Sequence, residues 1–153
     1  MSAPDSPHLL TSRVINSLYT ETMVLADEAR SYFDNFGQFD RDHLTPMQRV
    51  SFSCESLKVT TRLMHVIAWL LTQRSLASGE FDPTESLSPT LRLGDAAPSD
   101  DATLEGLPAD ARALIESSTD LYARVRRLDG DIASVAPSAN PARSLQKQLE
   151  RSF

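Results

Sequence analysis

The fold of this chain is set by residues 45–79, TPMQRVSFSCESLKVTTRLMHVIAWLLTQRSLASG. Thr45 suits the N-cap of a helix and Pro46 suits the first turn. Gln48 can return a hydrogen bond to the cap, which completes a capping box. No residue that breaks a helix follows before Gly79. The segment therefore predicts one helix over 46–78, roughly 50 Å long at 1.5 Å per residue.

Apolar residues recur along this helix at alternating spacings of three and four. Such spacing is typical of one helix face, and we expect this face to pack into the core. The face consists of Met47, Val50, Cys54, Leu57, Thr61, Met64, Ala68 and Leu71.

The C-terminal half of the same helix is apolar around more of its circumference than one face can use. A second subunit is one source of cover, and the segment over 80–106 folding back is another. On the first interpretation, the candidate dimer interface consists of Leu63, Val66, Ile67, Trp69 and Leu70.

Two further segments, over 12–36 and 108–135, repeat the three-four spacing and predict amphipathic helices. Gly37 and Gly79 lie where C-terminal capping glycines are expected, and Pro108 lies near a helix start. The sequence thus predicts an all-α fold, an antiparallel three-helix bundle over residues 12–136. We expect residues 1–11 and 137–153 to form a flexible N-terminus and a flexible C-terminal tail. The apolar faces consist of Ile15, Leu18, Thr22, Leu25, Ala29, Tyr32 and Phe36 in the first helix, and of Leu107, Ala111, Leu114, Ser118, Leu121, Val125, Leu128, Ile132 and Val135 in the last.

The connection over 80–106 differs in composition from the helices. It carries seven acidic residues against one basic residue, Arg92, which equals the formal net charge of −6 of the whole chain. Prolines at 83, 89 and 98 interrupt any helical pattern. We expect a long, acidic, mobile loop between the second and third helices, either as a solvated linker or as a place where a partner binds.

The composition argues against several classes of function. A single cysteine excludes a disulfide framework or a multi-cysteine metal site, and the three histidines lack partners at ligand spacing. No nucleophile motif or glycine-rich phosphate loop occurs, so we expect no catalytic, cofactor or metal site. The mild acidity argues against nucleic acid as a partner. The longest apolar run, over 63–71, is too short to cross a membrane, and we expect a cytoplasmic protein.

Two sets of residues are candidates for binding a partner. Glu55, Lys58 and Arg62 lie near one face of the second helix, either as an intrahelical ion pair or as a charged recognition strip. Leu145, Leu149 and Phe153 are four residues apart in the tail, which predicts either a short docking helix or a frayed terminus.

The second helix also carries a family signature. Residues 54–63 fit the pattern CES-x-x-x-TTRL, residues 68–74 fit AWLL-x-Q-R, and Gly79-Glu80 closes the helix. Over residues 12–135 the chain resembles the RcdA family of alphaproteobacteria, which is named for the regulation of CtrA degradation.

The resemblance implies a homodimeric three-helix bundle without catalytic activity. Members act as adaptors in proteolysis by ClpXP, together with a response-regulator-type adaptor, and bring cargo such as cell-cycle regulators to the unfoldase ClpX. The resemblance also implies a location at the cell pole. A different class of function stays open, namely a helical homodimer with a structural or DNA-associated role unconnected with proteolysis.

Overall fold

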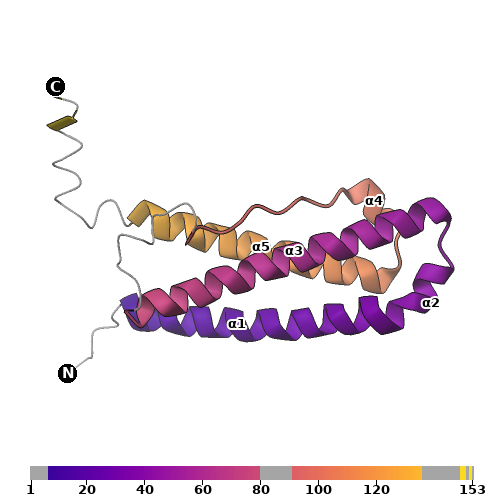
Figure 1. Cartoon of the computed structure of the whole chain (residues 1–153), viewed down its shortest axis with the longest axis horizontal. Helices are drawn as coiled ribbons and strands as arrows, with labels where there is room; N and C mark the ends of the chain where they lie inside the picture. The colour runs from indigo at the N-terminus through magenta and orange to yellow at the C-terminus, as the bar shows by residue number, and fades with distance from the viewer. Residues whose placement is uncertain (1–6, 80–90, 136–148, 151, 153) are drawn as a thin grey trace.

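The computed structural model describes residues 7–79, 91–135, 149–150 and 152, and within these ranges the chain folds into helices without any strand. This confirms the all-α prediction. The long helices are α1 (Pro7–Ser31), α3 (Pro46–Ala77) and α5 (Ala109–Val135). Three shorter elements join them, η1 (Tyr32–Phe36), α2 (Gly37–Asp42) and α4 (Asp101–Glu105). The long helices lie side by side, and each packs against the other two (Figure 1).

The capping box predicted at the start of α3 is confirmed. The Thr45 side chain accepts a hydrogen bond from the backbone N–H of Gln48, and the Gln48 side chain accepts one from the backbone N–H of Thr45. At the other end, Gly79 follows the C-cap with a φ of +81°, the left-handed conformation that glycine adopts most readily. Local sequence signals therefore locate both ends of α3.

The first helical run does not end at Gly37 as predicted. It continues through the π-helical turn η1 into α2, and Gly37 is helical with a φ of −74°. Gly37 is needed for space, because a Cβ there would lie 2.7 Å from the backbone oxygen of Tyr32. The Tyr32 hydroxyl donates to Asp40 of α2 at 2.8 Å, which fixes this turn. Phe36, predicted in the core, is exposed.

The helix directions differ from the predicted antiparallel bundle, because α3 and α5 run the same way. Arg62 of α3 bonds Ser118 of α5, and about two turns further along α3 and three turns further along α5, Trp69 bonds Asp129. If the chain had passed directly from the end of α3 into α5, the two helices would run in opposite directions. Instead, the chain travels back along the length of α3 before α5 begins (Figure 1).

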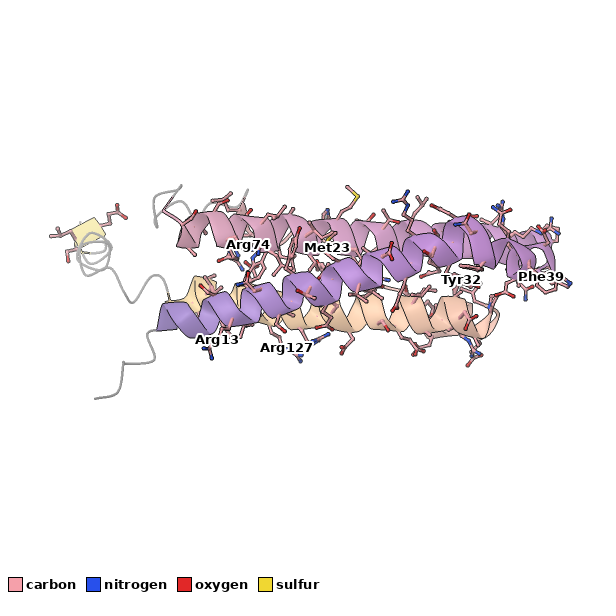
Figure 2. The ribbon with its side chains drawn as sticks, turned by 90° about the horizontal axis from the view of Figure 1, so that it is seen from below. Arg13, Met23, Tyr32, Phe39, Arg74 and Arg127 are labelled. Atoms are coloured by element: carbon pink, nitrogen blue, oxygen red, sulfur yellow. The ribbon has the colours of Figure 1, made fainter. Side chains whose placement is uncertain are left out.

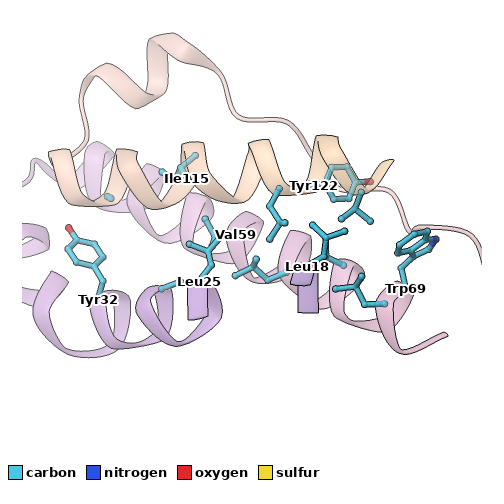
Figure 3. Close-up of a cluster of buried hydrophobic side chains, with 14 of the residues drawn as sticks. Leu18, Leu25, Tyr32, Val59, Trp69, Ile115 and Tyr122 are labelled. Atoms are coloured by element: carbon cyan, nitrogen blue, oxygen red, sulfur yellow. The ribbon is translucent and has the colours of Figure 1, made fainter. Parts of the chain in front are cut away.

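The core lies between the inner faces of the three long helices. Leu18 and Leu25 of α1 and Tyr32 of η1 point toward α3, where Val59 and Trp69 lie, and toward α5 (Figure 3). Viewed from below, α1 lies across the pair formed by α3 and α5 (Figure 2). The apolar faces predicted on the first and last helices supply half of this core, including Ile15, Ala29, Ala111 and Leu121.

The prediction of which face of α3 packs into the core is wrong. The large members of the predicted face are 44–76% exposed, and Cys54 is exposed as well. The buried face of α3 lies on the opposite side of the helix and consists of Phe52, Glu55, Val59, Arg62, Leu63, Val66, Trp69 and Leu70. The error arises because α3 carries apolar residues on two opposite faces, and spacing alone cannot say which face meets the other helices.

Candidate functional site

Residues 91–100, which we call the strap, run in extended form along the groove between α3 and α5. They cover the side of this helix pair that lies opposite α1 (Figure 1). Leu93 and Ala96 pack against the core, whereas Arg92, Ala97 and Pro98 remain exposed. The sequence predicts a mobile loop over 80–106, and its described part instead contacts both helices. Residues 80–90 lie outside the described ranges.

The predicted charged strip of α3 binds the strap. Lys58 Nζ donates to Glu55 at 3.0 Å and to the backbone oxygen of Pro98 at 3.1 Å. Arg62 donates to the backbone oxygen of Ala97 at 3.0 Å and to Ser99 Oγ at 2.6 Å. Ser99 Oγ in turn donates to Glu55. The three residues of the strip thus hold three consecutive positions of the strap.

Glu55 and Arg62 are each only 2% exposed. In the state that the structure shows, these two side chains are therefore covered and not open to another protein. Burial lowers the pKa of the Arg62 guanidinium, and the nearby Glu55 carboxylate opposes this effect. A buried charge is tolerated only when its hydrogen bonds are satisfied, and Arg62 meets this condition with a third bond, to Ser118 Oγ at 3.2 Å.

A second cluster holds the opposite end of the strap. The Asp129 carboxylate accepts hydrogen bonds from Trp69 Nε1 at 2.9 Å, from Arg92 Nε at 3.0 Å and from the backbone N–H of Leu93 at 3.4 Å. One carboxylate therefore joins α3, α5 and the strap. The sequence offers no signal for this role, since each of these partners is more than 35 residues from Asp129.

The middle of the strap is held by Tyr122 and His65. The Tyr122 hydroxyl donates to the backbone oxygen of Gly94 at 2.6 Å, and burial raises the pKa of Tyr122 above its ordinary value of 10.0. Gly94 lies so close to the His65 ring that a Cβ would come within 2.8 Å of His65 Nδ1. Only glycine allows this approach without displacing the ring.

The predicted dimer interface lies inside one protomer. Leu63, Val66, Trp69 and Leu70 are each at most 4% exposed, and Ile67 is half-buried. These side chains are covered by the other helices of the same chain, so a second subunit is not needed to cover them. The alternative interpretation, in which the segment over 80–106 folds back, agrees with the strap, which together with α1 and α5 covers the inner face of α3.

The face of α3 that points away from the core forms a continuous apolar line, which we call the outer stripe. It consists of Met47, Val50, Cys54, Leu57, Thr61, Met64, Ala68 and Leu71, all exposed. Its residues keep a strict seven-residue repeat with alternating steps of three and four, which is the spacing of a coiled-coil seam and also of the buried faces of α1 and α5. Spacing alone therefore does not distinguish this exposed face from a buried one.

The remaining candidates are only partly described. Leu149 of the predicted docking tail is 59% exposed, whereas Leu145 and Phe153 lie outside the described residues. No group of three or more His, Cys, Asp or Glu side chains that could hold a metal ion occurs within the part of the chain that the structure describes. In the same part, no helix is both long enough and apolar enough to span a bilayer.

These features define an all-helical protein whose surface offers a long apolar stripe and whose charged clusters hold its own chain together. A family model described as "Protein of unknown function (DUF1465)" matches residues 6–153. The crystal structure of RcdA from Caulobacter crescentus CB15 is 31% identical in sequence and covers 77% of this chain and 89% of its own, with a TM-score of 0.63. None of the curated proteins matches the chain. The chain belongs to the RcdA family, as the signature in α3 predicted.

Proposed function

We propose that this protein is a non-catalytic adaptor in regulated proteolysis, which helps to deliver cargo such as a cell-cycle transcriptional regulator to the ClpXP protease. Its place in the RcdA family, named for the regulation of CtrA degradation, supports this role. The observation that carries the proposal is the outer stripe of α3, because eight exposed residues in a coiled-coil repeat are typical of a surface that binds another protein.

An adaptor needs a rigid body and a binding surface, and it needs no reactive group. Bringing cargo next to a protease raises the local cargo concentration, to the millimolar range for a short connection. The partners that we propose are the unfoldase ClpX, a response-regulator-type adaptor and the protein cargo. We propose that the protein acts in the cytoplasm, at the cell pole.

We also propose that two copies of the chain associate through the outer stripe. From Met47 to Leu71 this stripe is about 36 Å long at 1.5 Å per residue. Its large side chains, Met47, Val50, Leu57, Met64 and Leu71, give it the apolar content that the core of a protein interface requires. This assignment replaces the buried residues around Trp69, which the protomer already uses for its own packing.

A degradation assay with purified components tests the function. ClpXP, the response-regulator-type adaptor and a fluorescent cargo are mixed with and without this protein, and the loss of cargo is followed over time. We expect the wild-type chain to accelerate cargo loss. Leu57→Arg places a charge in the middle of the outer stripe, and we expect it to reduce the acceleration at least fivefold.

Val14→Arg is the matched control, because Val14 is an exposed apolar residue on α1, outside the stripe. We expect this variant to act as the wild type does. Cargo loss that is unaffected by the wild-type chain, whichever cargo is used, would contradict the proposal. Binding to duplex DNA that weakens with added salt, without any effect on cargo, would support the structural or DNA-associated role instead.

A further inference from the structure

The strap is bound in the way that proteins bind separate peptides. Three of its backbone carbonyl oxygens accept hydrogen bonds from side chains of the helix pair: Gly94 from Tyr122, Ala97 from Arg62 and Pro98 from Lys58. Any extended peptide presents carbonyl oxygens at similar intervals. The groove therefore binds the segment that occupies it largely through the backbone carbonyl oxygens of that segment.

Two side chains of the strap add specificity at its ends. Arg92 bonds the Asp129 carboxylate, and seven residues later Ser99 bonds both Glu55 and Arg62. Between them, Pro98 favours an extended conformation at Ala97. The groove thus selects an extended segment with a basic residue at one end and a hydroxyl seven residues later.

Several of the contacts beneath the strap are polar, in addition to the packing of Leu93 and Ala96 against the core. When a polar contact opens, water can replace the hydrogen bonds of Lys58, Arg62 and Glu55, so separation is less costly than for an apolar helix. A shallow depression of about 320 Å³ also lies along the strap at its Arg92 end, lined by Asp95, Tyr122 and Asp129 among others. The strap consequently leaves part of the groove open at that end.

We propose that the groove between α3 and α5 is a peptide-binding site, and that the strap is the chain's own occupant of it. A partner protein with an extended segment of the same pattern, a basic residue followed seven positions later by a serine or threonine, displaces the strap and takes its contacts. The charged strip of α3 is then a partner-binding surface after all, available only when the strap leaves. This site does not depend on the proposed role in proteolysis.

A binding measurement with a synthetic peptide tests the site. The probe is a fluorescently labelled copy of residues 91–101, LRLGDAAPSDD, added to the full chain while fluorescence anisotropy is recorded. In the wild type the attached strap competes at an effective concentration in the millimolar range, so we expect very weak binding. In the double variant Arg92→Ala/Ser99→Ala the groove residues are intact and the competitor is weakened. We expect the peptide to bind this variant at least tenfold more tightly.

Control peptides and a second variant separate the outcomes. A peptide with alanine at the positions of Arg92 and Ser99 should bind the double variant at least tenfold more weakly than the native peptide. If the double variant loses its helical circular dichroism, Ser99→Ala alone replaces it, with an intermediate gain in affinity expected. Equal peptide binding by wild type and variant, or no binding by a folded variant at millimolar peptide, would overturn the proposal. The assay contains no protease, so neither result bears on the proposed role in cargo delivery.

Discussion

At the scale of single residues, the charged side chains of α3 show that tertiary contacts decide whether a charged residue is exposed or buried. Glu55, Lys58 and Arg62 have the spacing of an exposed charged strip, and the Glu55–Lys58 pair forms as that spacing suggests, at 3.0 Å. Their other partners lie 35 to 56 residues away and are Ala97, Pro98, Ser99 and Ser118. Through these long-range hydrogen bonds the three residues bind the strap, and Glu55 and Arg62 are buried rather than exposed.

The buried tyrosine that holds the strap predicts how stability depends on pH. Burial raises the pKa of Tyr122 in the folded protein, whereas the unfolded chain titrates near the ordinary value of 10.0. The unfolded state therefore loses its proton first, and the stabilisation is complete below pH 10 and falls as pH rises above it. We expect urea unfolding followed by circular dichroism to show a lower free energy of unfolding at about pH 10.5 than at about pH 8.

Tyr122→Phe isolates this effect, because phenylalanine has no group to titrate. Tyr32, whose pKa burial also raises, is present in both proteins and contributes to both pH dependences. We expect the variant to lose less stability than the wild type over the same pH interval. An identical loss in the two proteins would show that Tyr122 does not contribute.

At the scale of helices, local signals located α3 well and α1 less well. The capping box and Gly79 bound α3 to within one residue of the predicted end. The end of the first helical run was missed because Gly37 is used for close packing against Tyr32 rather than for a left-handed turn. A glycine in sequence can serve either purpose, and only the neighbouring atoms distinguish them.

The capping box predicts a measurable contribution to stability. Thr45→Ala removes the side-chain oxygen that accepts from Gln48, and we expect a loss of about 1 kcal/mol in the free energy of unfolding, measured with urea. Thr60→Ala is the matched control. Thr60 is an exposed threonine in the middle of the same helix, and its hydroxyl donates only to the backbone oxygen of Ser56. We expect this control to be neutral or slightly stabilising, since alanine favours the helix. Equal losses for both variants would contradict the capping interpretation.

At the scale of the whole molecule, the parallel course of α3 and α5 explains the length of the connection between them. The chain must return along the helix pair before α5 begins, and the extended strap covers that distance in few residues (Figure 1). With α1 on one side of the pair and the strap on the other, the inner face of α3 is covered within one protomer. The outer stripe stays exposed because no element of the described chain lies over it.

The outer stripe predicts the oligomeric state. The chain has a mass of 16.9 kDa, and we expect light scattering of the wild type to give the mass of two chains. Leu57→Arg, which buries a charge at the proposed seam, should give the mass of one chain with unchanged helical circular dichroism. Val14→Arg on α1 should remain dimeric. A wild-type mass of one chain at every concentration would exclude association through the stripe.

The sequence by itself determined the helical class, the ends of α3 and the family signature, because caps and periodicity depend on residues only a few positions apart. The inner faces of α1 and α5 followed from the same periodicity, since each of these helices has a single apolar face. Only the tertiary structure decided which of the two apolar faces of α3 is buried, the direction of α5, and the binding of Ser99 by Arg62 and Glu55. Those features depend on contacts between segments that are far apart in the sequence. A local pattern of residues does not show which distant segments come into contact.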